Sequence, residues 1–446
     1  MSGLARLLLE LGWQVSGSDL KPSATTERLI SMGARVEIGH RAENLPDVAE
    51  LVVVSSAIPE DNVEYQEARR RGMKIVRRGE LLAMLFNERR GVAVAGSHGK
   101  TTTTAMIALV LERGGLDPTV AVGAEINGLG TNARLGKGPY MVAEADESDG
   151  SFLLLRPEIA VITNIEADHL DYYRDFARIE EAFHRFGEGI KEGGLAVLGI
   201  DSEPVAQMGR QLSRRYISYG FRPDAQLRAV DCVGEGMVTR GRVLYQNRSL
   251  GMLELRVPGL HNMANALAAV AVGLEWGIPF AQIASALGEF RGTSRRFQFT
   301  GEIDGVSVYD DYAHHPTEIK ATLKAARQRG AQRIIAVFQP HRYTRTAFLY
   351  REFATAFGDA DVVVLSDIYS AGEPPQPGVN TGLILNAMRE AEKDKEIYYF
   401  PSQEEIVNFL AGYVREGDLV LTMGAGDIWK AGRELISLLR ERQRTG

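Results

Sequence analysis

Short apolar runs rich in β-branched residues alternate with amphipathic helical patterns along most of this chain. The runs that we expect to be buried strands are 51–56, 91–95, 140–145, 159–164, 333–338, 361–366 and 418–423. Helical spacing of apolar residues occurs at 316–328, 345–357, 402–415 and 428–442. Strands that are apolar on both faces and separated by helices favour parallel sheets covered on both sides. The sequence therefore predicts the α/β fold class.

The length of 446 residues favours about three domains. A basic stretch at 87–90 precedes a new strand, and segment 291–297 follows a helical pattern and opens a new series of strands. The strand-rich region 193–256 indicates an irregular part of the middle domain. The predicted domains are 1–88, 89–294 and 295–446.

Composition narrows the class of protein. The net charge of -7 gives no support to nucleic-acid or anionic-membrane binding. The lone cysteine, Cys232, excludes an intrachain disulfide and fits a reducing compartment. No apolar run approaches the about 20 residues of a membrane span. The first residues lack the basic and long apolar regions of a signal peptide and include Glu10. These features predict a soluble, cytoplasmic, globular protein.

A glycine loop joins strand 91–95 to the next helical pattern, and its sequence is Gly96-Ser97-His98-Gly99-Lys100-Thr101-Thr102. In such a loop, backbone N–H groups and the helix N-terminus surround phosphate oxygens. Lys100 adds a positive charge, and the Thr101 hydroxyl can ligate Mg²⁺. The common P-loop has a further glycine where this chain has Val94. A turn that only caps a helix is the alternative, but strand, helix and Lys-Thr together predict an ATP or GTP site.

Acidic residues follow two strands of the predicted sheet. Strand 140–145 leads into Glu144, Asp146, Glu147 and Asp149, and strand 159–164 leads into Glu166, Asp168, His169 and Asp171. Ligands of open α/β sheets collect at the carboxyl ends of strands, and phosphoryl transfer needs a metal to neutralise phosphate charge. A solvated acidic loop and a structural histidine are the alternatives. We expect a metal site at this edge.

Seven segments occur in an order typical of one family: GSHGKTTT, AEADESDGSF, TNIEADHLD, PGLHNMANALAA, GTSRRF, DDYAHHPTE and FQPHRYTRT. On these segments the chain resembles the Mur ligases, from SGSD at 16–19 to the glycine turn at 423–427. The resemblance implies a Rossmann-like UDP-binding domain, a central P-loop ATPase with a mostly parallel sheet, and a Rossmann-like C-terminal domain that closes over the site. It also implies ATP-dependent joining of L-alanine to the carboxylate of UDP-N-acetylmuramate through an acyl phosphate, in peptidoglycan precursor synthesis, with Mg²⁺ or Mn²⁺.

The same resemblance implies site residues, motif by motif. Catalytic residues would be Lys100, Glu144, His169, Arg296 and Asp311, and metal ligands would be Thr101, Glu144 and His169. ATP would contact the glycine loop together with Asn262, Asn265, Arg296 and Tyr312. The UDP-sugar would contact Asp19, His40, Ser55, Ser56 and Ala57, and the amino acid would contact His314, His341, Arg342 and Arg345.

Simpler interpretations exist for several of these residues. Asn262 and Asn265 fall in the first turn of a helical pattern at 262–276 and could be N-caps. The pair His314-His315 could only start a helix. The arginines at 342 and 345 could lie in a solvated loop, although after a strand their guanidinium groups can grip a carboxylate bidentately.

The start of the sequence gives a further expectation. Members of the family that this chain resembles open with a strand and a G-x-x-G-x-G loop immediately before Met-Ser-Gly, whereas here Met1 leads directly into an amphipathic helix. Strand 13–17 would then be the second of its domain. We expect the first strand to be missing, so that 13–17 and 51–55 flank a gap, and the native start to lie upstream.

Two rival functions remain open. A sister ligase that attaches a preformed peptide to the same nucleotide sugar would share the DDYAHHPTE motif but diverge at FQPHRYTRT. A P-loop switch protein would need a guanine-reading N-K-x-D motif after a strand, and the corresponding stretch here reads NIEAD. Amide formation, as opposed to ATP hydrolysis alone, separates an enzyme from a switch.

Overall fold

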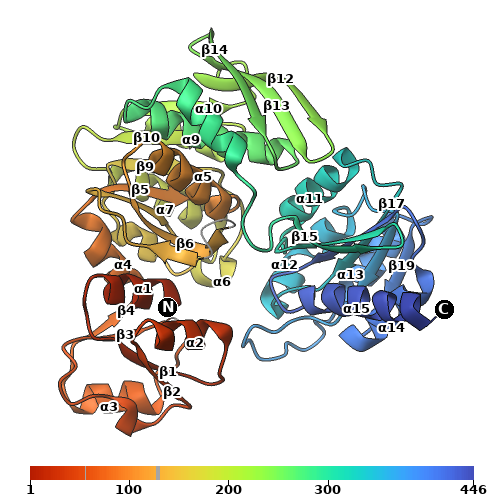
Figure 1. Ribbon diagram of the computed structural model, residues 1–446, viewed down its shortest axis with the longest axis horizontal. Coiled ribbons are helices and arrows are strands. Elements are labelled where there is room, and N and C mark those ends of the chain that lie inside the picture. Colours follow the sequence, from red (N-terminus) through yellow and green to blue (C-terminus); the bar gives the residue numbers. More distant parts are fainter. Residues whose placement is uncertain (56, 127–130, 446) are drawn as a thin grey trace. The chain divides into compact units, whose positions relative to one another are not determined.

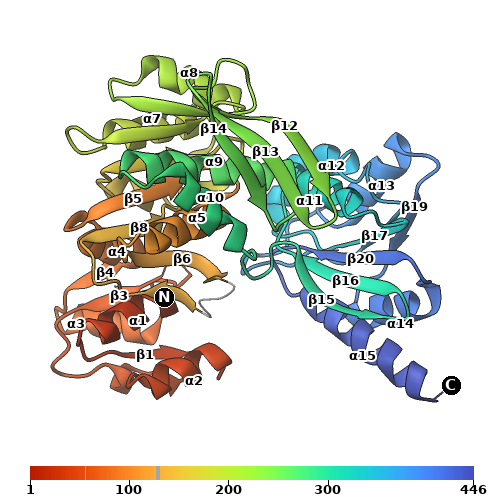
Figure 2. The same cartoon turned by 45° about the horizontal axis from the view of Figure 1, so that its top comes forward.

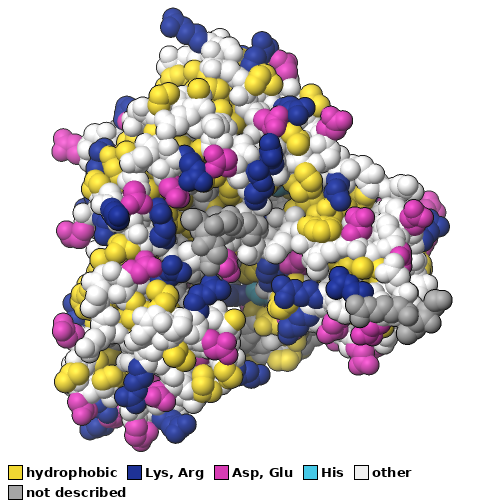
Figure 3. All heavy atoms as spheres, in the orientation of Figure 1, with side chains coloured by type: hydrophobic (Ala, Val, Ile, Leu, Met, Phe, Trp, Pro, Cys, Tyr) yellow, Lys and Arg dark blue, Asp and Glu magenta, His cyan; other side chains and the backbone are white. Residues whose placement is uncertain are grey.

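The computed structural model describes residues 1–55, 57–126 and 131–445. These residues form two compact units. The first unit comprises 1–230, 242–252 and 264–287, and the second comprises 231–241, 253–263 and 288–446. No helix of the described residues is long and apolar enough to cross a membrane. On the face shown in Figure 3, Lys and Arg side chains are interspersed with Asp and Glu rather than gathered by sign.

A ten-stranded sheet has the order β14-β13-β12-β11-β10-β9-β5-β8-β6-β7. Its strands are β5 (Arg90–Ala95), β6 (Thr119–Ile126), β7 (Thr131–Arg134), β8 (Tyr140–Glu144), β9 (Ile159–Ile162), β10 (Leu195–Gly199), β11 (Tyr216–Gly220), β12 (Leu227–Glu235), β13 (Val238–Tyr245) and β14 (Arg248–Leu255). In the order of the sheet, β6, β8, β5, β9, β10 and β11 are parallel neighbours, whereas β7 pairs antiparallel with β6. The central position of β5, between β9 and β8, determines what surrounds the loop that follows it.

Helices cover this sheet because its middle strands are apolar on both faces. The helices are α4 (Arg78–Asn87), α5 (Lys100–Arg113), α6 (Leu170–Tyr173), α7 (Phe176–Glu188), α8 (Glu203–Gln211), α9 (Leu260–Glu275) and α10 (Phe280–Glu289), with a short 3₁₀ turn, η2 (Ser151–Leu154) (Figure 1). All four residues of β9 are buried. Phe152 packs on Phe183 and Phe186 of α7, with ring centroids 5.4 and 5.1 Å apart.

The N-terminal residues form two small parallel sheets, β1-β2 and β3-β4. Their elements are α1 (Ser2–Glu10), β1 (Ser16–Asp19), α2 (Ala24–Ser31), β2 (Arg35–Ile38), η1 (Ala42–Asn44), β3 (Val52–Val54), α3 (Val63–Arg70) and β4 (Ile75–Arg77). The strand expected at 13–17 begins only at Ser16, because the preceding residues close α1. Gly12 has a φ of +87°, and the N–H of Trp13 donates to Leu8 O at 2.9 Å. This left-handed cap uses the residues that the sequence pattern assigned to the strand.

The second unit contains a six-stranded sheet of order β15-β16-β20-β17-β18-β19. Its strands are β15 (Gln298–Ile303), β16 (Val306–Asp311), β17 (Arg333–Phe338), β18 (Val362–Leu365), β19 (Glu396–Tyr399) and β20 (Asp418–Met423). All neighbours are parallel except β15 and β16. Its helices are α11 (Pro316–Gln328), α12 (Tyr343–Ala354), α13 (Gly382–Ala391), α14 (Gln403–Tyr413) and α15 (Trp429–Thr445) (Figure 2).

Alternating residues of β17 enter two different cores. Ile334 and Phe338 pack in the cluster that includes residues of α11, α12 and α13, whereas Ile335 and Val337 pack in the cluster with α14 and α15. The sheet is therefore buried on both faces, as predicted for parallel strands between helices. The α/β fold class is confirmed, and strands 333–338 and 418–423 and helix 316–328 have the predicted bounds.

Candidate active site

The loop that follows β5 requires glycine at two positions. Gly96 has a φ of +138° and Gly99 a φ of +80°, a region that other residues rarely adopt. A Cβ on Gly96 would lie 2.0 Å from Thr163 Oγ1, and one on Gly99 would lie 2.7 Å from Asn265 Oδ1. Neighbouring side chains thus fill the space beside the loop, and only glycine lets the backbone pass.

Gly96→Ala should therefore destabilise the fold and abolish nucleotide binding. The free energy of unfolding should fall by roughly 2–6 kcal/mol, of which backbone strain accounts for about 1–3 kcal/mol and overpacking for about 1–3 kcal/mol. Thermal unfolding and nucleotide titration measure the two effects. Gly193→Ala is the control for strain alone, since Gly193 also has a positive φ but no atom within 4 Å of its Cβ position. An unchanged nucleotide affinity in Gly96→Ala would contradict the role of this loop.

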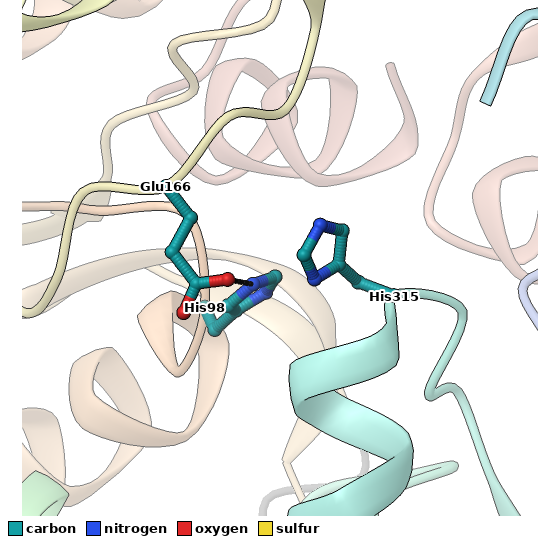
Figure 4. Close-up of side chains that lie close together, drawn as sticks. All are labelled: His98, Glu166 and His315. Atoms are coloured by element: carbon teal, nitrogen blue, oxygen red, sulfur yellow. Dashed lines mark hydrogen bonds and ion pairs between the residues drawn. The ribbon is translucent and has the colours of Figure 1, made fainter. Parts of the chain in front are cut away.

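The segment after β9 holds the phosphate loop in shape. Asn164 brackets His98: its Oδ1 accepts from His98 N at 2.9 Å, and its Nδ2 donates to His98 O at 3.0 Å. The Thr163 hydroxyl donates to the same carbonyl at 2.6 Å. Glu166 N donates to Ser97 Oγ at 2.8 Å, and the His98 ring lies 3.3 Å from Glu166 Oε2, as Figure 4 shows. Sequence reasoning missed Thr163 and Asn164, although their position after a strand was a usable signal.

Lys100, the first residue of α5, folds back over the loop. Its ammonium donates to Gly96 O at 2.6 Å, Ser97 O at 3.2 Å and Glu147 Oε1 at 2.7 Å. Burial acts to lower the pKa of Lys100, but the carboxylates of Glu147, Asp146 and Glu144 outweigh it and raise this pKa. Lys100 is therefore a fixed positive charge held by two backbone carbonyls and the Glu147 carboxylate.

Glu147 was predicted only as part of an acidic run, and the structure makes it the partner of Lys100. Its side chain is 3% exposed, and within the described residues its Oε2 has no hydrogen-bond partner. Burial raises the pKa of Glu147 to about 7, against the opposing charge of Lys100, and the neighbouring Asp146 adds to the rise. Lys100 thus offsets only part of the cost of burying this carboxyl group.

The oxygen atoms of Thr101 and Glu144 lie together at the end of β8. The Thr101 hydroxyl is 3.0 and 3.2 Å from the two Glu144 carboxylate oxygens, and Gly123 N donates to Glu144 Oε2 at 2.8 Å. Hydroxyl and carboxylate oxygens are the donors that Mg²⁺ prefers. The third expected ligand, His169, has its Nε2 3.8 Å from Glu147 Oε1 and 3.7 Å from Asp168 Oδ2. Its membership of the same metal site stays a prediction.

The two asparagines of α9 lie inside the helix rather than at its cap. The helix begins at Leu260, two residues before the predicted start, so the N-cap interpretation is wrong for both. Asn265 Oδ1 accepts from the Thr103 hydroxyl at 3.1 Å, which ties α9 to α5. Asn262 Nδ2 donates to Pro258 O at 2.7 Å. Both side chains are largely buried.

In the second unit, Asp311 at the end of β16 holds a turn in place. Its carboxylate accepts from Phe297 N and Ala313 N, both at 2.7 Å. Burial raises the pKa of Asp311 to about 6, against the charge of Arg296. The Arg296 guanidinium lies 5.3 Å from the Tyr312 ring centroid and 3.4 Å from Glu318 Oε1. The structure thus brings Asp311, Arg296 and Tyr312 together, with Glu318 beside them.

The expected amino-acid residues form a second group in this unit. The His314 and His341 rings are 5.9 Å apart, and Arg345 Nη1 lies 3.2 Å from His341 Nδ1. Arg345 is 9% exposed, so its guanidinium is not in a solvated loop. Arg342 has a φ of +72° and lies 3.8 Å from Glu373.

The residues expected to bind the UDP-sugar lie on several separate segments of the N-terminal region. His40 Nδ1 lies 2.8 Å from Ser18 Oγ, which donates to Glu64 Oε2 at 2.6 Å. Asp19 ends β1, Ser55 and Ala57 follow β3, and Ser56 lies outside the described residues. A cavity of about 230 Å³ is lined by Ser2, Arg6, Thr25, Arg28, Leu29, Met32, Glu125, Thr131 and Asn132. None of the four described residues expected to bind the sugar lines it.

A glycine loop between a central parallel strand and a helix, with carboxylates after both flanking strands, defines an α/β protein of the phosphate-binding loop class. Three family descriptions match the chain: "Mur ligase family, catalytic domain" at 1–90, "Mur ligase middle domain" at 94–273 and "Mur ligase, glutamate ligase domain" at 295–426. The chain belongs to the Mur ligase family.

Individual relatives agree with this assignment. The chain is 53% identical to the UDP-N-acetylmuramate–L-alanine ligase of Pelotomaculum thermopropionicum, over 100% of this chain and 96% of that protein. It is 29% identical to the UDP-N-acetylmuramate-alanine ligase MurC of Thermotoga maritima, whose crystal structure matches with a TM-score of 0.84 over 100% of this chain and 97% of that one. A murein peptide ligase of Psychrobacter arcticus, 24% identical, shares the fold with a TM-score of 0.73 over 98% and 96% of the two chains.

Proposed function

We propose that this chain joins L-alanine to the carboxylate of UDP-N-acetylmuramate at the expense of ATP, in the synthesis of peptidoglycan precursors. The observation that carries this proposal is the phosphate loop with Lys100 at its centre, on a chain that matches an L-alanine-adding ligase over its full length. The use of ATP and a nucleotide sugar favours a cytoplasmic location. We also propose the domain limits 1–88, 89–294 and 295–446, for the UDP-sugar, ATP and amino acid respectively.

The first chemical step would activate a poor electrophile. A muramyl carboxylate oxygen attacks the γ-phosphorus of ATP, the bond to the β-phosphate oxygen breaks, and an acyl phosphate and ADP form. The loop 96–99 would enclose the phosphates, and Lys100 would exchange its contacts with backbone carbonyls and Glu147 for phosphate oxygens. Glu147 supports this exchange, because a carboxyl group with a pKa of about 7 readily takes up a proton when the lysine leaves.

The second step would form the amide. The uncharged amine of L-alanine attacks the acyl carbon, the tetrahedral intermediate loses a proton, and phosphate leaves. Arg345 and Arg342 would hold the alanine carboxylate, since guanidinium groups bind carboxylates bidentately. His341 and His314 lie beside Arg345 and would shape the pocket around the amine. Water must be excluded, because it would hydrolyse the acyl phosphate.

We propose Mg²⁺ as the resident metal, held by Thr101 and Glu144 with His169 as a further ligand. The adjacent hydroxyl and carboxylate oxygens support the first two assignments, and His169 rests on the family motif. When bound, the metal would neutralise phosphate charge as the phosphoryl group moves. Asn262, Asn265, Arg296, Asp311 and Tyr312 are proposed to contact ATP, and Asp19, His40, Ser55, Ser56 and Ala57 the UDP-sugar.

Phosphate release with UDP-N-acetylmuramate, ATP and a panel of amino acids plus one tripeptide tests the function. We expect release with L-alanine, an amide product of the corresponding mass, loss of activity in EDTA and recovery with Mg²⁺. Preference for the tripeptide would favour the sister ligase that attaches preformed peptides. ATP hydrolysis without any amide would favour a nucleotide-dependent switch and overturn the proposal.

A further inference from the structure

Segment 367–373, which follows β18, lies against the chain that carries the proposed amino-acid residues. Tyr369 N donates to Pro340 O at 2.8 Å, and Arg342 N donates to Tyr369 O at 2.8 Å. These bonds form an isolated parallel bridge between His341 and Tyr369. One backbone hydrogen bond on each side of His341 fixes where this residue leaves the sheet edge.

The Tyr369 ring fixes the His341 ring as well. The two rings are stacked, with centroids 5.7 Å apart and an angle of 9° between planes. Gly426 approaches the tyrosine closely, since a Cβ on Gly426 would lie 2.6 Å from Tyr369 Cγ. Tyr369, although 40% exposed, therefore lies between the backbone at Gly426 and the imidazole of His341.

Glu373, at the end of this segment, caps α12. Its carboxylate accepts from Thr344 N at 3.1 Å and from the Thr344 hydroxyl at 2.6 Å, and its Oε1 lies 3.8 Å from Arg342 Nη1. Arg342 occupies the N-cap position but makes no side-chain capping bond. Glu373 thus supplies, from another segment, the acceptor that an N-cap residue usually provides. It also lies beside an arginine whose φ of +72° is unusual for a residue with a side chain.

We infer that segment 367–373 is a positioning element of the amino-acid site, with Glu373 and Tyr369 as its working residues. Glu373 holds the first turn of α12 and the guanidinium of Arg342, and Tyr369 holds His341, which contacts Arg345. All three proposed amino-acid contacts on this stretch thus depend on the segment. The inference rests on the proposed function, because it assumes that the amino acid binds there.

Steady-state kinetics of Glu373→Ala and Glu373→Gln test this inference. Glu373→Ala removes the carboxylate contacts with Thr344 and Arg342. It should therefore raise the KM for L-alanine about tenfold or more. Glutamine retains an oxygen that accepts from Thr344 but loses the charge facing Arg342, so Glu373→Gln should show a smaller rise. The KM for ATP and that for UDP-N-acetylmuramate should change less than about twofold.

The matched control is Asp361→Ala. Asp361 likewise accepts a backbone N–H, from Ile334 at 2.7 Å, and pairs with an arginine, Arg327, at 2.6 Å. It directly precedes β18 and contacts the start of β17, whereas Arg342 follows the end of β17. Asp361→Ala should lower the Tm to a similar extent but leave the KM for L-alanine unchanged.

Two results would overturn the positioning role: an unchanged alanine KM in Glu373→Ala, or equal increases of all three KM values that track the fall in Tm. Tyr369→Phe and Tyr369→Ala provide a second pair, because only the alanine variant removes the ring that stacks on His341. An unchanged alanine KM in both tyrosine variants would remove Tyr369 from the element. If the wild-type protein shows no alanine-dependent phosphate release, the proposed function itself fails, and the two failures are distinguishable.

Discussion

Lys100→Ala should lower alanine-dependent phosphate release by at least about 100-fold, since preorganised charges at a phosphoryl-transfer site contribute several kcal/mol to the barrier. Gly96 O and Ser97 O hold the ammonium against the loop, and phosphate oxygens would replace these contacts. The measurement is initial-rate phosphate release at saturating substrates. Retention of more than about a tenth of the wild-type rate would contradict the phosphate-loop assignment.

The control must separate lost chemistry from lost stability. Lys100→Ala leaves Glu147, which is 3% exposed, without its counter-charge. Removing one partner of a buried pair costs about 3–5 kcal/mol, so the single variant should have a lower Tm. The double variant with Lys100→Ala and Glu147→Gln replaces this carboxyl group, which without Lys100 either stays charged or takes up a proton, each at a cost in stability. It should recover most of the Tm and none of the activity.

The sequence predicted which side chains gather around the glycine loop, because the strands around it are buried on both faces. Such strands appear as continuous apolar runs, and the side chains that follow them meet at one edge of the sheet. The structure places β8 and β9 on either side of β5, so Glu144 and Thr163 both come next to the glycine loop. The glycine-loop motif predicted the type of site, and the parallel sheet explains why side chains from separate strands lie together beside it.

Other contacts depend on strand order and backbone path, which no local pattern specifies. The clamp that Asn164 makes on His98 requires β9 to be the neighbour of β5, and no local sequence pattern states which strand lies there. The cap that Glu373 makes on α12 joins residues whose contact follows from the β17–β18 pairing. The start of β1 also differs from the predicted one, because the cap at Gly12 that ends α1 precedes it.

The resemblance assigns Arg342 and Arg345 the same role in the second unit, but the structure gives them different surroundings. Arg345 is buried beside His341, and Arg342 lies at the helix start beside Glu373. A buried guanidinium is held in one orientation and loses less freedom when it binds a carboxylate. We therefore expect Arg345 to make the larger contribution to amino-acid binding.

Arg345→Ala should raise the KM for L-alanine by about 10- to 100-fold, the equivalent of about 1.5–3 kcal/mol for hydrogen bonds to a charged group. The KM for ATP should change less than about threefold, because the proposed ATP contacts in this unit belong to Asn262, Arg296, Asp311 and Tyr312. Arg345→Lys keeps the charge but loses the planar fork, and should recover only part of the alanine affinity. Arg342→Ala should show the same selectivity with a smaller rise. Equal increases in the two KM values would move both arginines out of the amino-acid pocket and leave the alanine carboxylate to another cation.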